Sequence, residues 1–232
     1  MPLKAEALEL GEVDELAALV GAANTLIFDG AIRRIYNTDV GGLVAALRAA
    51  GVVHTPQVTI LGSGATARSS LVSVAQLGAQ HVTLMVRDPD KGRRLEPLAA
   101  QLGVVLTVAG WDDALPTADV LISTVTAGVA DSRADAAAAS AATVFDAIYH
   151  PWPTALAVSA TRANRTVVSG LDLLVGQAVL QIELMTTRSV DPELLRAAGR
   201  AELGGGSVES GQNEPARTGA AHTKDRRSAV KD

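Results

Sequence analysis

The stretch that decides the fold is Val58-Thr59-Ile60-Leu61-Gly62-Ser63-Gly64-Ala65-Thr66-Ala67. Its first four residues predict a buried strand and its last residues open a helix, so the two glycines lie in the turn between them. In such a turn the first glycine allows a tight bend, and the second lets the backbone approach a pyrophosphate. A small residue, here Ala67, lets the helix pack closely on the sheet. The context favours a dinucleotide-binding unit over the alternative, a plain strand-to-helix turn.

Strands and helices alternate after this turn. Further strands are predicted over 81–86, 104–108, 119–124, 143–147 and 166–168, and helices over 65–77, 91–102, 134–142 and 155–163. Repeated β-α units with nearly continuous apolar strands predict an α/β fold, a doubly wound parallel sheet of the Rossmann type.

The segments on either side are predicted as follows. A helix over 4–23 is expected first, then two strands, 25–28 and 32–36, that form a hairpin at Asp29-Gly30. A helix over 40–50 leads into the turn, a long helix over 171–187 follows the last strand, and Pro192 opens a short one. From residue 201 the composition is polar and poor in aliphatic residues, which predicts a disordered tail.

Composition limits the function classes. Hydrophobic residues make up 48% of the 232, the net charge is −5 and there is no cysteine. The acidic balance argues against a nucleic-acid binder, and the lack of cysteine excludes disulfides, thiolate catalysis and Cys-based zinc sites. No export signal or membrane-spanning stretch is recognised, so a cytoplasmic protein is expected. No metal site is expected either.

The end of the strand over 81–86 bears on the cofactor. NAD-specific folds usually carry Asp or Glu about 20 residues past the glycines, where it binds the ribose 2′-hydroxyl. Here Arg87 lies 23 residues after Gly64. Its planar fork suits a 2′-phosphate, which favours NADP(H). The next residue, Asp88, could repel that phosphate or accept from a ribose hydroxyl, so strict NADP use and dual use both stay open.

Six segments over about residues 1–188 form one pattern by their order and spacing. They are Met1-Pro2-Leu3-Lys4, Gly21-Ala22-Ala23-Asn24-Thr25, Asn37-Thr38-Asp39, the Gly62 turn with Val86-Arg87-Asp88, Phe145-Asp146-Ala147-Ile148-Tyr149 with Pro153-Thr154, and Gly170-Leu171-Asp172-Leu173-Leu174-Val175-Gly176-Gln177-Ala178. Together these segments resemble shikimate dehydrogenase, more than any one of them does alone.

The resemblance implies a reaction and a set of residues. The family reduces 3-dehydroshikimate to shikimate with NADPH, on the route to chorismate and the aromatic amino acids. It places catalysis on Lys4 and Asp39, since charge that builds on a reduced ketone needs a proton donor. It implies substrate binding by Asn24, Asp39, Tyr149 and Gln177. The expected cofactor residues are Gly62, Ser63, Gly64, Ala65, Thr66, Arg87, Asp88, Thr124 and Gly170.

The resemblance also has departures. Ala65 stands where the family often has a second glycine, Asp88 where it often has Thr or Ser, and Ser123-Thr124-Val125-Thr126-Ala127-Gly128 replaces its usual loop. The family has a β-α-β opening with a Ser-x-Ser pair before the lysine motif. This sequence begins at the lysine motif. A start site set too far downstream and a truncated gene are the two explanations. Weak or no dehydrogenase activity with retained nucleotide affinity is therefore expected.

The expected division of the chain follows from this. Residues 1–40 would be a remnant of the substrate-binding domain, 41–169 the NADP-binding Rossmann domain, 170–200 helices that return to the substrate domain, and 201–232 the tail. Two alternatives to a shikimate dehydrogenase are kept: an inactive NADP-binding paralogue, and a quinate- or shikimate-type polyol dehydrogenase. The oligomeric state, with a homodimer as one option, is left open.

Overall fold

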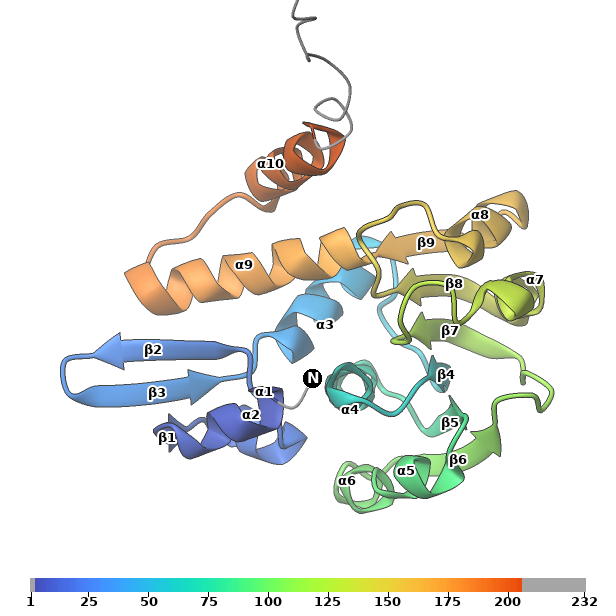
Figure 1. Cartoon of the computed structure of the whole chain (residues 1–232), viewed down its shortest axis with the longest axis horizontal. Coiled ribbons are helices and arrows are strands. Elements are labelled where there is room, and N and C mark those ends of the chain that lie inside the picture. The colour runs from blue at the N-terminus through green and yellow to red at the C-terminus, as the bar shows by residue number, and fades with distance from the viewer. Residues whose placement is uncertain (1–2, 206–232) are drawn as a thin grey trace, which may run out of the picture.

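The computed structural model describes residues 3–205. It contains a three-stranded sheet near the N-terminus and a six-stranded sheet formed by the middle of the chain. Two helices, α3 (Asp39–Ala49) and α9 (Gly170–Thr186), run between the two sheets (Figure 1). The two parts are therefore joined by a helical layer.

The larger sheet confirms the predicted doubly wound fold. Its strands are all parallel in the order β6-β5-β4-β7-β8-β9. Because the order reverses between β4 and β7, the carboxyl ends of these strands form the crevice where such sheets bind ligands. The strand bounds are β4 Gln57–Leu61, β5 His81–Val86, β6 Val105–Gly110, β7 Ala118–Ser123, β8 Ala141–Asp146 and β9 Thr166–Ser169.

Helices cover both faces of this sheet because alternate strand residues point to opposite sides. Ile60, Leu84 and Ile122 belong to one core cluster, and their neighbours Leu61 and Met85 belong to another. The covering helices are α4 Ala65–Gln76, α5 Pro89–Arg93, α6 Glu96–Gln101, α7 Ala134–Ser140 and α8 Ala155–Arg162, with a 3-10 turn, η2, over Asp131–Arg133.

The single helix predicted over 91–102 is wrong, because α5 and α6 are separate helices. Pro97 lacks the N–H that would bond to the carbonyl of Arg93, the residue at which α5 ends. Pro97 instead lies in the first turn of α6, where no such bond is required.

The helix predicted over 4–23 is also wrong. That segment forms α1 (Leu3–Glu6), the 3-10 turn η1 (Ala7–Glu9), β1 (Glu12–Val13) and α2 (Glu15–Val20). Gly11 passes so close to β3 that an added Cβ would lie 2.3 Å from the Arg33 carbonyl oxygen. Asp14 then begins α2 by accepting a hydrogen bond from the Leu16 amide at 3.0 Å.

The predicted hairpin is confirmed. Strands β2 (Thr25–Asp29) and β3 (Ile32–Tyr36) pair antiparallel, and β1 pairs with β3 in parallel. Gly30 in the turn has φ +60°, a conformation that glycine adopts without strain. In this small sheet Thr25, at the start of β2, pairs with Tyr36, at the end of β3. The residue before β2 therefore lies beside the residues that lead into α3.

Helices α3 and α9 touch through two glycines. A Cβ added to Gly176 would lie 2.6 Å from the Gly42 carbonyl oxygen, and one added to Gly42 would lie 2.9 Å from the Gln177 amide nitrogen. Only glycines permit such an approach of two helix backbones. It brings the first residue of α3, Asp39, next to Gln177, which lies in the middle of α9.

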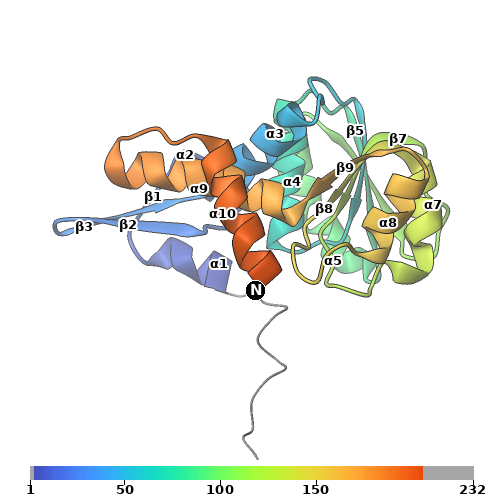
Figure 2. The same cartoon turned by 90° about the horizontal axis from the view of Figure 1, so that it is seen from above.

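Helix α10 (Pro192–Gly205) packs on α9 and lies in front of the helical layer (Figure 2). It extends beyond the boundary at which the tail was predicted to begin, so residues 201–205 are helical. Residues 206–232, the rest of the predicted tail, lie outside the described part of the chain. Among residues 3–205, no helix combines the length and apolar character that a membrane crossing would need.

We expect Gly176→Ala to disturb the helix contact. The new methyl group would meet the backbone of Gly42, which cannot move aside as a side chain can, at a cost of about 1–3 kcal/mol. Urea unfolding measures the free energy of unfolding of this variant and of a control. Gly204→Ala in α10 is the matched control, since a Cβ there meets nothing within 4 Å. Equal stabilities for the two variants would contradict the contact.

Candidate active site

Four side chains from distant parts of the chain meet at one carboxylate, and we call them the Lys4 cluster: Lys4, Asn24, Asp39 and Gln177. The Lys4 ammonium forms an ion pair with Asp39 Oδ2, and Gln177 Nε2 donates to Asp39 Oδ1. Asn24 Nδ2 also donates to Asp39 Oδ1, at 2.9 Å. The Asp39 side chain is 3% exposed and the Lys4 side chain 22%, so the carboxylate is buried beneath a lysine that solvent still reaches.

Local structure holds each member of the cluster. The Lys4 carbonyl accepts from the Ala23 amide at 2.7 Å, which ties α1 to the residue before Asn24. Asn24 Oδ1 accepts from the Thr38 amide at 2.9 Å, so both functions of its side-chain amide bind the segment that begins α3. The bond to the Thr38 amide fixes the Asn24 side chain, and the bond from Asn24 to Asp39 then fixes the carboxylate.

Gln181 is a residue that the sequence analysis missed. It lies one turn after Gln177 on α9, and its Nε2 donates to Thr25 Oγ1 at 3.1 Å. It thereby extends the polar network from the cluster to the start of β2. The spacing of four residues, which puts both amides on one helix face, is the signal that could have found it.

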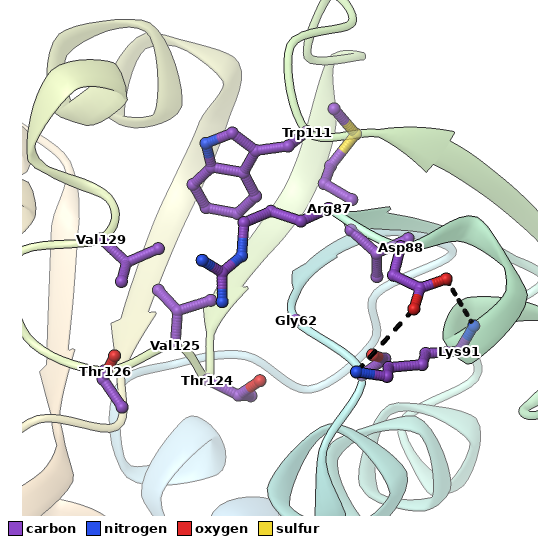
Figure 3. Close-up of a pocket in the computed structure, with 12 residues that line it drawn as sticks. Gly62, Arg87, Asp88, Lys91, Trp111, Thr124, Val125, Thr126 and Val129 are labelled. Atoms are coloured by element: carbon purple, nitrogen blue, oxygen red, sulfur yellow. Dashed lines mark hydrogen bonds and ion pairs between the residues drawn. The ribbon is translucent and has the colours of Figure 1, made fainter.

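The cofactor crevice is a cavity of about 470 Å³ at the carboxyl ends of β4, β5 and β7 (Figure 3). Of the residues predicted to bind cofactor, five line it: Gly62, Ser63, Arg87, Asp88 and Thr124. The Arg87 side chain extends into the cavity below the Trp111 ring, while Asp88 and Lys91 lie together at the opposite edge. Arg87 forms no ion pair within residues 3–205.

The glycine turn has the geometry that a bound pyrophosphate requires. Gly62 has φ +105°, and an added Cβ would lie 2.7 Å from Thr124 Oγ1. Thr124 Oγ1 donates to the Leu61 carbonyl at 2.8 Å, which holds the neighbouring loop against the turn. Gly64 is exposed at the start of α4, where a Cβ would meet nothing within 4 Å. The N-terminus of α4 carries no side-chain cap, so its amides are open to an anion.

The remaining predicted cofactor residues lie outside the cavity lining. Ala65 and Thr66 form the first turn of α4 beside Gly64. Gly170 begins α9 and is buried against the backbone of Ala147, whose carbonyl oxygen would be 2.2 Å from an added Cβ. Gly170 therefore serves close packing here, and its contact with a cofactor stays a prediction.

Tyr149 does not join the Lys4 cluster within the described hydrogen bonds. It is 46% exposed and lines a second cavity of about 310 Å³ with Trp152 and two arginines of α10, Arg196 and Arg200. Its predicted role at the substrate stays a prediction.

The cavity lining contains residues that the sequence analysis did not select. Lys91 lies on α5, four residues after Arg87 in the sequence, and Trp111 follows β6, the strand beside β5. The Arg133 guanidinium lies 5.8 Å from the centre of the Trp111 ring, on which it stacks. Thr126, Val125 and Val129 complete that wall. Within residues 3–205, no group of three or more His, Cys, Asp or Glu residues could hold a metal ion.

A second buried carboxylate supports the loop that carries Tyr149. Burial raises the pKa of Asp146, against hydrogen bonds from Thr154, the Ile148 amide and Ser123, which lower it. The bond from Thr154 Oγ1 to Asp146 Oδ2 is 2.7 Å long, and Thr154 also caps α8. Asp146 therefore fixes the segment between β8 and α8.

This raised pKa predicts a pH dependence of stability. The folded protein retains the Asp146 proton longer than the unfolded chain does, so stability is full below the ordinary pKa of about 4 and falls as the pH rises through the folded value. Asp146→Asn should remove this loss, as urea unfolding across pH measures. Asp135→Asn is the control with the opposite sign. The pKa of Asp135 is lowered by a hydrogen bond from Ser159 and by the charge of Arg162, so its contribution to stability is lost as the pH falls. A wild-type pH profile unchanged by Asp146→Asn would contradict the assignment.

Comparison with known proteins identifies the family. No protein-family model matches the chain. A shikimate dehydrogenase (NADP(+)) from Methanothermobacter thermautotrophicus is 35% identical over 205 residues, which cover 84% of this chain and 72% of that protein. The chain belongs to the shikimate dehydrogenase family.

Solved structures agree with this assignment. Shikimate dehydrogenase of Mycobacterium tuberculosis superposes with a TM-score of 0.80 at 37% identity, over 87% of this chain and 76% of that one. A shikimate 5-dehydrogenase of Thermus thermophilus, solved in complex with NADP(H) and shikimate, superposes with a TM-score of 0.74 at 26% identity, over 87% and 76%. The fold of these enzymes thus extends over most of this chain.

Proposed function

We propose that this protein is an NADP-dependent shikimate dehydrogenase, which reduces 3-dehydroshikimate to shikimate. The observation that carries the proposal is the Lys4 cluster, in which a buried carboxylate binds three partly buried donors within a dinucleotide-binding fold. The relatives that bear the name shikimate dehydrogenase (NADP(+)) support both the substrate and the cofactor.

Lys4 is proposed to donate the proton. Reduction of a ketone builds negative charge on its oxygen, and an ammonium group beside that oxygen both stabilises the charge and supplies the proton. Asp39 holds the Lys4 nitrogen in place through their ion pair. Since Lys4 remains partly exposed, it can recover a proton from solvent after each turnover.

Asn24 and Gln177 are proposed to bind the substrate ring while they order Asp39. Each amide has two N–H groups and a carbonyl oxygen. Gln177 gives one hydrogen bond to Asp39 and retains capacity for a hydroxyl group. Asn24 already donates to Thr38 Oγ1 and Asp39 Oδ1, so a substrate hydroxyl would take the place of its Thr38 contact. Tyr149 remains a proposed substrate contact on the loop after β8.

NADP(H) fits the crevice. The bound cofactor supplies the hydride. Gly62 and Gly64 would admit its pyrophosphate to the open amides at the start of α4, with Ser63, Ala65 and Thr66 around it. Arg87 and Lys91 supply positive charge for the 2′-phosphate at the edge of the cavity.

The test is shikimate-dependent reduction of NADP⁺ by the purified protein, followed by NADPH absorbance. We expect turnover that requires shikimate, weak for this chain, and none without shikimate. Nucleotide binding without turnover of shikimate or quinate would favour the inactive paralogue. A higher kcat/KM for quinate would favour a polyol dehydrogenase of that type.

Three further expectations from the sequence are carried as proposals. They are the division at residues 40 and 169 into a substrate-binding part and a Rossmann domain, a homodimer as one option for the oligomeric state, and a cytoplasmic location. Sedimentation equilibrium at several protein concentrations tests the dimer, and a single mass equal to the monomer would contradict it.

A further inference from the structure

The edge of the cofactor cavity contains both a cation suited to a 2′-phosphate and a carboxylate suited to a 2′-hydroxyl. Arg87 and Asp88 are adjacent in sequence, both are exposed, and both line the cavity with Lys91. A Rossmann site usually carries one of the two recognition groups, according to its cofactor. Their joint presence needs a physical explanation.

Asp88 is held at the cavity by the backbone of α5. It is the N-cap of that helix, and its Oδ1 accepts from the amides of Asp90 at 3.1 Å and Lys91 at 3.4 Å. Turning the carboxylate away would leave these two amides without their capping acceptor. The charge of Asp88 therefore stays at the cavity edge whichever nucleotide binds.

Its second oxygen remains available to a ligand. Asp88 Oδ2 lies 3.8 Å from Lys91 Nζ, beyond hydrogen-bond length, and the two side chains are 50% and 63% exposed (Figure 3). An ion pair so loose and so exposed is weak, so a ribose hydroxyl can take the place of the lysine at Oδ2. The same carboxylate reduces the pull of Lys91 on a phosphate.

The charges of Arg87, Lys91 and Asp88 favour neither cofactor exclusively. Two cations and one carboxylate leave a net charge of +1 where a 2′-phosphate, with about −1.5 to −2, would lie. NAD(H) brings a neutral hydroxyl instead, which can donate to Asp88.

We infer that Asp88 makes this a dual-cofactor site, in which the carboxylate weakens NADP(H) binding and supports NAD(H) binding. The inference rests on the proposed dinucleotide function. In this site Asp88 sets the preference between NADP(H) and NAD(H).

The test compares Kd for NADP⁺ and NAD⁺, by isothermal titration calorimetry, in the wild type, Asp88→Ser and Asp88→Asn. Both replacements remove the charge and retain an N-cap. We expect Asp88→Ser to tighten NADP⁺ binding about ten-fold, because a nearby repulsive charge is lost. NAD⁺ binding should weaken about five-fold, because an acceptor for the hydroxyl is lost. Asp88→Asn, which keeps a carbonyl oxygen, should match the gain for NADP⁺ and lose less for NAD⁺.

Asp90→Ser is the matched control. Asp90 is two residues away in the same helix and pairs with Arg93, but it does not line the cavity. It should leave the ratio of the two constants unchanged. Raised salt should reduce the NADP⁺ gain of Asp88→Ser, because screening weakens the repulsion that the wild type retains.

The outcomes separate the inference from the proposed function. Equal changes in both constants, or no change in either, would mean that Asp88 only caps α5 and would overturn the inference alone. A shift in the ratio by Asp90→Ser as large as that by Asp88→Ser would overturn it too. A wild-type protein that binds neither nucleotide would overturn the proposed function and the inference together.

Discussion

Lys4→Ala is expected to lower kcat for shikimate oxidation by about 10²–10⁴-fold, the usual contribution of a general acid or base. The Kd for NADP⁺ should not change, because Lys4 is absent from the lining of the nucleotide cavity. The physical reason is that Lys4 is the partly exposed donor paired with a carboxylate that is otherwise buried. Steady-state kinetics with shikimate and calorimetry with NADP⁺ measure the two effects.

Lys4→Arg is the control for the ion pair. Arginine retains a positive charge for Asp39, so the fold should be as stable as that of the wild type, but its guanidinium does not release a proton near neutral pH. We therefore expect kcat to remain low in this variant. Full activity in Lys4→Arg would show that charge alone suffices and would contradict the role of Lys4 as proton donor.

The larger sheet could be predicted because its signals are local. A strand such as β5 is an unbroken apolar run, and it was predicted with the bounds that the structure has, His81–Val86. The glycine turn before α4 identifies itself by its own residues, since it needs φ +105° at Gly62 and open space at Gly64. Nothing distant in the chain is needed for either conclusion.

The N-terminal segment could not be predicted in the same way. Residues 4–23 have an apolar pattern compatible with one helix, but Glu12 and Val13 pair with β3, more than twenty positions away. Gly11 is required there by contact with Arg33, a relation that no local window contains. Tertiary packing overrides the helical preference of this segment.

The candidate site lies between these two cases. Asp39 and Gln177 are 138 positions apart, so only the family resemblance joined them, and the structure then brought their side chains into contact. Composition and spacing alone would have left Asp39 as a turn or cap residue and Gln177 as a buried helix residue. Gln181 and Trp111 lacked such a motif and were found only from the structure. The resemblance also named Tyr149, which lines a second cavity, and Gly170, which packs on the Ala147 backbone; neither lines the nucleotide cavity.

Arg87→Ala is expected to weaken NADP⁺ binding by about ten- to one-hundred-fold, the range for loss of a hydrogen bond to a charged group. NAD⁺ binding should change much less, because NAD⁺ lacks the 2′-phosphate that the guanidinium would contact. Arg87 extends into the cavity and forms no ion pair within residues 3–205. Its removal therefore leaves no carboxylate unpaired. Arg93→Ala, on the same helix as Lys91 but outside the cavity and paired with Asp90, is the matched control. Equal losses for the two nucleotides in Arg87→Ala would mean that Arg87 contacts the part they share, such as the adenine ring, and not the 2′-phosphate.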